Sequence, residues 1–353
     1  MEQTYTVSLI SNSMPSPGNL IPDRVRASDG SALQTCLSLT PLTFFSIIIN
    51  SLHFELETAL LYNYLWGEKN MIRISTSSWS LHRSLGKPQM RAPDGPPADG
   101  TAAGATLSLL ELPGPLAAAG FGTLEICHFH FPSTDAAYLA ELRGAAQDAG
   151  VEIFSVLIDA GDITHSDPAQ LEKELAWIRG WLDVASAIGA SHSRVIAGYA
   201  PVERTGRDLR THPLIRQSAV NLRALSAYGQ ERGVRVITEN FRATAERADQ
   251  LLTILELCAG AVGTCADFGN FKGADKYDEL AAIAPRADSA HAKALYDGEG
   301  YPDRAELTRC LDLMAATNFD GPISLIFDTP FYRGEDEWDN LGVLRELVLP
   351  FTA

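Results

Sequence analysis

From Met71 onward the chain repeats one pattern eight times: a short apolar run of strand length, then a longer stretch with helical periodicity. Such alternation predicts parallel strands joined by crossover helices. Eight units are the number that closes an α/β fold into a (β/α)8 TIM barrel. An open doubly wound sheet usually has fewer strands, and no GxGxxG motif follows the first run here. The predicted strands are Ile72–Ser77, Thr123–Cys127, Val151–Ile158, Ser193–Ala197, Val234–Glu239, Ala261–Asp267, Ala287–Lys293 and Pro322–Asp328.

The stretches between these runs predict helices, several of which end where a glycine follows. Gly150, Gly189 and Gly233 each stand between a helical pattern and the next strand, a position that favours glycine because it adopts positive φ without strain. Pro168 suits the first turn of its helix. The predicted helices are Leu107–Ala119, Asp135–Ala149, Pro168–Ile188, Pro213–Arg232, Ala245–Cys258, Asp275–Ala284, Asp303–Thr317 and Glu335–Leu349.

Residues 1–70 differ from the rest and are predicted to be an N-terminal extension, either disordered or a translated leader. Met1–Thr35 is rich in Ser and Pro and has no periodicity. Leu37–Phe54 is apolar, but it is short and interrupted for a membrane helix and lies too far from the start for a signal peptide. A Gly-Glu pair precedes Met71, and its codons can spell a purine-rich ribosome-binding sequence. We therefore expect Met71 to be the natural start and residues 71–353 to form the barrel domain.

The net charge and the cysteine spacing limit which classes of partner and which cellular compartment are expected. The formal net charge is −16, and so acidic a surface repels phosphate backbones, which argues against a nucleic-acid partner. The five cysteines are scattered without a CxxC pair, as expected in a reducing cytoplasm. No membrane partner is expected, and the sequence leaves open whether the chain forms a homo-oligomer.

Three metal-type residues stand at the ends of three consecutive predicted strands: Glu239, Asp267 and His291. In a (β/α)8 barrel the carboxyl ends of the strands form the active-site face. Neighbouring strands lie about 4.8 Å apart, so these side chains can converge on one ion. Two carboxylates and an imidazole suit Mn²⁺, Mg²⁺, Co²⁺ or Zn²⁺. The alternative is that each residue is a solitary polar group, paired with an arginine or a backbone amide.

The same stretches resemble the sugar phosphate isomerase/epimerase family, which has a xylose-isomerase-like TIM barrel. The resemblance rests on Thr238-Glu-Asn240, on Gly263-Thr-Cys-Ala-Asp-Phe-Gly-Asn270 and on His291-Ala-Lys293, with weaker likeness in strands two and eight. It extends from Met71 to the C-terminus. It implies that Glu239, Asp267 and His291 bind a divalent metal ion, and that the chemistry is proton transfer next to a sugar carbonyl.

One departure from the family concerns strand eight. The family usually completes the metal site there with a glutamate, and this chain has Ile326 in that place. Asp328 shares a strand face with Ile326 and lies nearer the mouth. It is therefore a candidate for direct or water-mediated ligation, for proton transfer, or for capping the following turn. An epimerase needs two groups that exchange protons on opposite faces, and only Glu239 of the usual pair of glutamates remains.

Several other polar residues are candidates for roles at the mouth. His130, preferred over His128, is a candidate proton-transfer group because an imidazole titrates near neutrality. Lys293 and Asn240 are candidates for substrate contacts, as is Trp79, which would stack on a sugar face. Arg194 either contacts substrate or pairs with Glu125 or Glu239 inside the barrel, and Glu125 is expected to be a buried, paired carboxylate. For His130, Lys293 and Trp79 an ordinary structural role is the alternative.

The leading hypothesis is a divalent-metal-dependent isomerase or epimerase of a sugar, sugar phosphate or related polyol, with Glu239 as the base. A lyase, dehydratase or deglycosidase acting on keto-sugars with a single base is the second. A non-catalytic sugar-binding or partner subunit is the third, and the acidic charge argues against a fourth, an endonuclease. Substrate choice is expected to lie in loops 85–105 and 199–211.

The expected start at Met71 is tested by N-terminal sequencing of protein made from its own gene. We expect the first residue to be Met71 or its successor, since the strand pattern begins there. A terminus at Met1 would contradict this expectation.

Overall fold

The computed structural model describes residues 73–86, 92–95, 104–203, 206, 208–329 and 336–352. The expected extension, residues 1–70, and Met71 itself lie outside the described residues. Of the expected rim loop at 85–105, only residues 85, 86, 92–95, 104 and 105 are described. The account of the fold therefore concerns the barrel.

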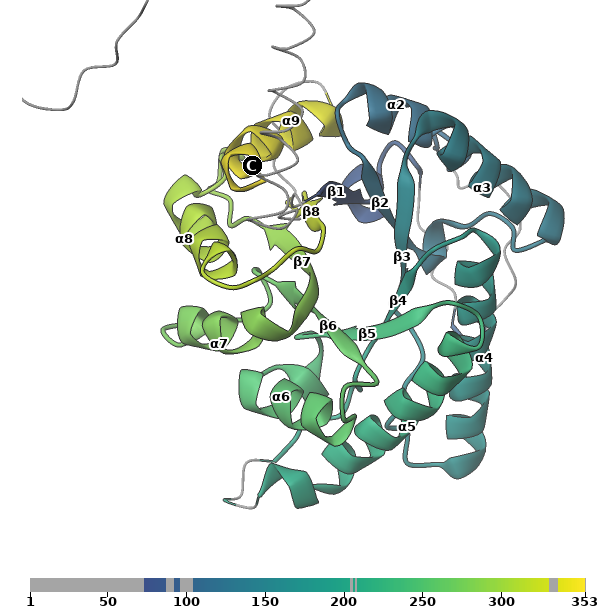
Figure 1. The fold of residues 1–353 in the computed structure, drawn as a ribbon, viewed down its shortest axis with the longest axis vertical. Helices are drawn as coiled ribbons and strands as arrows, with labels where there is room; N and C mark the ends of the chain where they lie inside the picture. Colours follow the sequence, from purple (N-terminus) through teal and green to yellow (C-terminus); the bar gives the residue numbers. More distant parts are fainter. Residues whose placement is uncertain are drawn as a thin grey trace, which may run out of the picture. The chain divides into compact units, whose positions relative to one another are not determined.

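Eight parallel strands close into one barrel in the order of the chain, and the helices surround it (Figure 1). Each strand pairs with its sequence neighbours, and β1 pairs with β8 to complete the ring. The predicted (β/α)8 TIM barrel is thus confirmed. The strands are β1 Ile74–Ser77, β2 Thr123–Cys127, β3 Glu152–Ile158, β4 His192–Val195, β5 Arg235–Glu239, β6 Gly263–Asp267, β7 Ala287–Lys293 and β8 Ile323–Ile326.

The helices agree with prediction to within a few residues at most ends. Gly150 ends α3 in the left-handed conformation, with φ of 69°, as its position in the sequence predicts. The helices are α2 Pro113–Ala118, α3 Ala136–Ala149, α4 Pro168–Ala187, α5 Pro213–Gln230, α6 Ala248–Leu257, α7 Lys276–Ile283, α8 Arg304–Ala315 and α9 Glu337–Val348.

One helix prediction is wrong over half its length. Residues 107–112 form turns, and α2 begins only at Pro113. Ser108 and Glu111 explain the difference: the Glu111 carboxylate accepts hydrogen bonds from the backbone N–H and the hydroxyl of Ser108. Such a local side-chain bond competes with helix formation. Proline then fits the first helical turn because its missing N–H is not needed there.

The outer face of the barrel is apolar, and its inner face carries both polar and apolar side chains. Leu124 and Ile126 of β2 belong to the large apolar core that the helices cover. Thr123, Glu125 and Cys127, which alternate with them, are also buried but point into the barrel. On the inner face, Phe154, Ile237 and Cys265 form a small apolar cluster of their own, and polar groups such as Glu125 share that face with them.

Two further expectations concern the membrane and the cysteines. No helix among the described residues is long and apolar enough to cross a membrane. The four described cysteines are buried free thiols: Cys127, Cys258, Cys265 and Cys310.

Replacing Gly321 by Ala should lower the unfolding midpoint. An added Cβ at Gly321 would lie 2.0 Å from the backbone oxygen of Asp288, so β7 and β8 would have to separate where they pair. We expect a loss of about 1–3 kcal/mol, typical of overpacking. Gly180→Ala is the control: nothing lies within 4 Å of its added Cβ in α4, and alanine should stabilise the helix by about 0.5–1 kcal/mol. Thermal unfolding of both variants measures this, and a Gly321→Ala protein as stable as the parent would refute the close approach.

Candidate metal centre

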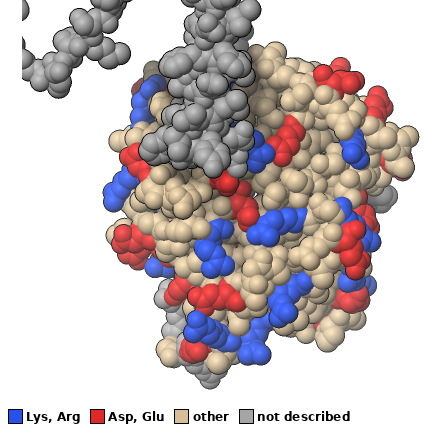
Figure 2. Space-filling view, in the orientation of Figure 1, with Lys and Arg blue, Asp and Glu red and all other residues tan. Residues whose placement is uncertain are grey.

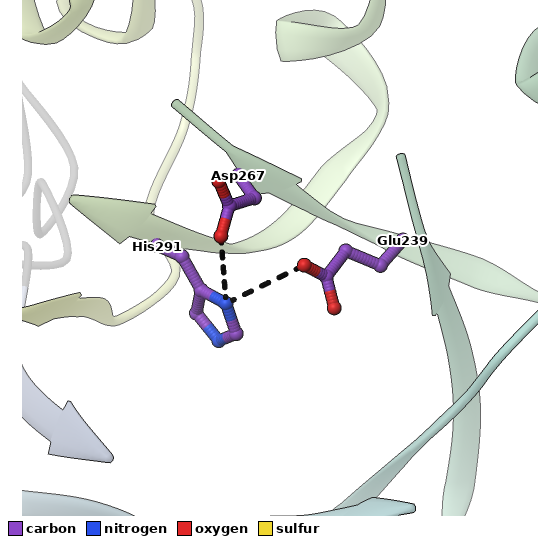
Figure 3. Close-up of side chains that lie close together, drawn as sticks. All are labelled: Glu239, Asp267 and His291. Carbon is purple, nitrogen blue, oxygen red and sulfur yellow. Dashed lines mark ion pairs between the residues drawn. The ribbon is translucent and has the colours of Figure 1, made fainter. Parts of the chain in front are cut away.

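Three consecutive strands bring Glu239, Asp267 and His291 together at the mouth of the barrel (Figure 3). Glu239 ends β5, Asp267 ends β6, and His291 lies on β7 beside Asp267 in the strand register. All three side chains are buried, with relative exposures of 3–4%. Within the part of the chain that the structure describes, they form the one group of this kind whose ligand atoms all lie within 4.8 Å of one another.

The three side chains point their ligand atoms at a common centre. The Nδ1 atom of His291 lies 3.5 Å from Asp267 Oδ2 and 3.8 Å from Glu239 Oε1 (Figure 3). Two carboxylate oxygens and one imidazole nitrogen make a donor set that suits a divalent ion. The residues present therefore fit the metal that the sequence led us to expect.

Glu125 fixes the orientation of the His291 ring. The Glu125 carboxylate is fully buried and lies 2.8 Å from His291 Nε2, and it also accepts a 2.5 Å hydrogen bond from the Ser324 hydroxyl. With the Nε2 proton donated to Glu125, the Nδ1 lone pair faces Asp267 and Glu239, as a ligand must. Burial lowers the pKa of His291, but Cys265, Glu125 and Asp267 outweigh it and hold that pKa well above its ordinary value. These surroundings favour positive charge at Nδ1, where a bound cation would replace the proton of the imidazolium.

Asn240 holds Asp267 in place and points away from the cavity. Its side-chain oxygen accepts a hydrogen bond from the Asp267 backbone N–H, and its side-chain NH₂ donates to the Asp267 carbonyl. The Asp267 carboxylate in turn accepts a 2.7 Å hydrogen bond from the backbone N–H of Gly269. The buried Asn240 amide therefore joins the ends of β5 and β6, whereas a substrate contact was the expectation from sequence.

Glu239 is held on both sides. Asn270 donates a 2.9 Å hydrogen bond to its Oε1 atom, and Arg194 forms a 2.9 Å ion pair with its Oε2 atom. Arg194 also bonds to Asp159, at 2.7 Å. The expected pairing of Arg194 with Glu239 is thus present. Sequence reasoning assigned no role to Asn270, although it stands in the motif that carries the resemblance.

A cavity of about 320 Å³ opens over these groups, within the range of small-molecule sites. Figure 2 shows side chains of both charges intermixed near the middle of the face seen along the barrel. The lining combines charged groups with apolar side chains. The lining residues are Ser77, Trp79, Cys127, Phe129, Leu157, Asp159, Arg194, Glu239, Phe241, Arg242, Asp267, Asn270, His291, Lys293, Ile326 and Asp328.

Strand eight presents Ile326 to the cavity, as the sequence indicated. Asp328 lies nearer the mouth, forms a 2.5 Å ion pair with Lys293 and is not part of the three-residue group. Burial raises the pKa of Asp328, but the hydrogen bond and charge of Lys293 outweigh it, so the net pKa is lowered. Asp328 is therefore held as a carboxylate by its partner.

The two histidines after β2 do not line this cavity. Residues 128–130 form a short 3-10 helix, which turns both rings away from the strand direction of β2. His128 is fully buried and its Nδ1 atom accepts a hydrogen bond from the Asp159 N–H. His130 bonds through Nδ1 to the Ser78 hydroxyl, and burial lowers its pKa to about 3. A neutral imidazole outside the cavity is poorly placed for the proton transfer proposed from sequence.

Trp79 does line the cavity, as a sugar-stacking residue would. Its ring stacks on His82 with centroids 4.6 Å apart and meets Phe129 edge to face. Trp79 and Phe129 thus form an aromatic wall of the cavity, and the Trp79 side chain also hydrogen-bonds to Asp328.

Comparisons with known proteins support the fold. Residues 115–346 match the family model of the xylose isomerase-like TIM barrel. Solved structures with similar folds include D-allulose 3-epimerase from Methylomonas sp., with 18% identity, TM-score 0.58 and coverage of 80% of this chain and 98% of that one. The 3-keto-D-glucoside 4-epimerase of E. coli has 15% identity, TM-score 0.55 and coverage of 78% and 99%.

A xylose isomerase-like TIM barrel protein from Mycobacterium smegmatis in complex with magnesium has 17% identity, TM-score 0.54 and coverage of 80% and 97%. No curated protein sequence matches significantly. At these identities the structural likeness speaks for the fold alone.

Replacing Glu125 by Gln should weaken metal binding without touching a ligand. The amide keeps the shape but removes the charge that supports His291, so we expect the dissociation constant for Mn²⁺ to rise about 10- to 100-fold. Glu337→Gln is the control, because Glu337 is also buried but bonds to the backbone of Arg83 and Ser84. Isothermal titration with Mn²⁺ measures both. Equal affinities in the Glu125→Gln and parent proteins would contradict the positioning role.

Proposed function

This chain belongs to the xylose isomerase-like TIM barrel family, and on that premise we propose that it is a divalent-metal-dependent isomerase or epimerase of a sugar or sugar derivative. The observation that carries the proposal is the convergence of Glu239, Asp267 and His291, all buried, beneath a cavity of substrate size. The names of two structural neighbours, both epimerases of keto-sugars or ketoses, support the choice of substrate class.

The three converging side chains would hold the ion. When bound, a divalent ion at this centre supplies stabilisation of the negative charge that develops on the oxygens of a carbonyl and its neighbouring hydroxyl. Asp267 and His291 are kept in place for this by Asn240 and Glu125. The buried position excludes most water, so charges act there more strongly than in solution.

Glu239 is the proposed base that removes the proton next to the carbonyl. Its carboxylate is held at both oxygens, by Asn270 and by Arg194, so it faces the cavity in one orientation. A base held in this way accelerates proton abstraction because little conformational entropy is lost on reaching the reactive geometry. The aromatic wall at Trp79 and Phe129 offers a surface for the carbon face of a sugar.

The return of the proton is where this chain differs from a symmetric two-glutamate site. Ile326 occupies the wall where the second glutamate is usual, and its side chain has no ionisable group that could return a proton. The nearest titratable groups on that side are Asp328 and Lys293, which are paired with each other. If either returns the proton, the reaction is an epimerisation or isomerisation.

Ile326 also favours a second candidate. Elimination needs only one base at the carbon next to the carbonyl, so a lyase, dehydratase or deglycosidase acting on keto-sugars would use the same site with Glu239 alone. The two candidates share the ion, the base and the first step. They differ in whether the proton returns or a leaving group departs.

Solvent-deuterium exchange tests the shared first step. Incubation of ketoses and 3-keto-glycosides with the protein and Mn²⁺ in D₂O should place deuterium next to the carbonyl, as followed by NMR. Glu239→Gln should lower the exchange rate at least about 100-fold, because the base is lost. Glu256→Gln, on an exposed glutamate paired with Arg210, should leave it unchanged.

The products separate the candidates in the same experiment. A deuterated epimer or isomer supports the leading proposal, and a released leaving group supports elimination. Sugar binding with neither outcome would indicate a non-catalytic sugar-binding protein. Exchange that persists in Glu239→Gln at the parent rate would refute the role of this residue.

A further inference from the structure

Arg242 has a backbone conformation that side-chain-bearing residues rarely adopt. It follows β5 by three residues and has φ of 63° and ψ of 169°. This region is essentially restricted to glycine, and residues held there in spite of it cluster at functional sites. The strain therefore directs attention to what the Arg242 side chain does.

The Arg242 side chain reaches the same cavity as Glu239. Its guanidinium carbon lies 4.5 Å from the centroid of the Phe241 ring and 5.6 Å from that of Tyr199. The Phe241 ring also lies 5.6 Å from the guanidinium carbon of Arg194, which pairs with Glu239. The Phe241 ring thus lies within cation–π distance of both arginines, and the rings of Phe241 and Tyr199 hold Arg242 at the mouth.

The other two cations of the cavity are neutralised, and Arg242 is not. Arg194 pairs with Asp159 and Glu239, and Lys293 pairs with Asp328. Among the residues that the structure describes, Arg242 forms no ion pair with a carboxylate. A guanidinium at a substrate cavity that forms no ion pair with the described carboxylates keeps its N–H donors for an anion from outside.

We propose that Arg242 is an anion-binding residue of the substrate site, and that the substrate is a sugar bearing a carboxylate or a phosphate. The inference rests on the proposed function, since it names the substrate class of the same site. The planar guanidinium grips the anionic group by paired N–H donors at the β5 side of the mouth. The carbonyl end of the sugar then lies towards Glu239, Asp267 and His291.

Binding of non-reactive ligands tests this without requiring turnover. Sorbitol, sorbitol 6-phosphate and gluconate are titrated calorimetrically into the full-length protein with Mn²⁺ at low ionic strength. We expect at least one of the two anions to bind about ten- to a hundredfold more tightly than sorbitol. Preference for one anion over the other identifies phosphate or carboxylate as the group recognised.

Arg242→Gly is the informative variant because glycine suits this backbone, so the loop can keep its path. The preference for the anion over sorbitol should fall about tenfold or more, and Arg242→Lys should retain only part of it. Arg309→Ala is the matched control: Arg309 also lies over an aromatic ring, 3.6 Å from the Tyr277 centroid, but does not line the cavity. It should keep the preference.

Three results would overturn the inference: sorbitol binding as tightly as both anions, none of the three ligands binding, or Arg242→Gly and Arg309→Ala losing the preference equally. These outcomes are separate from those of the proposed function. Exchange of neutral ketoses alone would leave the function standing and refute the anion site. Arg242-dependent anion binding without exchange of any sugar would support the anion site and count against the proposed function.

Discussion

The proximity of two buried carboxylates governs the mouth of this barrel. Glu239 and Asp267 end neighbouring strands, and their oxygens lie within 4.8 Å of each other and of His291. Two like charges in a desolvated site are unstable unless positive charge and hydrogen bonds compensate them. Arg194, Asn270 and the Gly269 N–H supply part of that compensation. The rest of the negative charge is best compensated by a cation next to His291 Nδ1, because this atom faces both carboxylates.

The groups that stabilise the Glu239 carboxylate are unevenly placed around it, and this bears on the chemistry that the site can support. The two shortest contacts to Glu239 come from the β4 and β6 sides, from Arg194 and Asn270. On the β8 side the wall is Ile326, and the polar pair above it, Lys293 and Asp328, compensates itself. The site therefore contains one firmly positioned carboxylate, Glu239, and one ion pair, Lys293 with Asp328. This arrangement is compatible with the proposed removal of a proton from one defined face of the substrate.

The fold and the three converging residues were predictable because they follow from periodicity. Parallel strands in a closed barrel end at one rim, so Glu239, Asp267 and His291 had to meet once the strands were placed. The contacts made by Asn270 and Arg242 were not predictable, since loop backbone is set by tertiary packing. His130 shows the same limit: alternation ends with β2 at Cys127, and the 3-10 turn that follows redirects the ring to Ser78.

A crystal structure of the protein with Mn²⁺, using the anomalous scattering of manganese, tests the central claim most directly. We predict one strong anomalous peak about 2.0–2.2 Å from an oxygen of Glu239, an oxygen of Asp267 and Nδ1 of His291, with Glu125 still bonded to Nε2. The absence of a peak between these three side chains at saturating Mn²⁺, or a peak that contacts none of them, would contradict the claim that they share a metal ion.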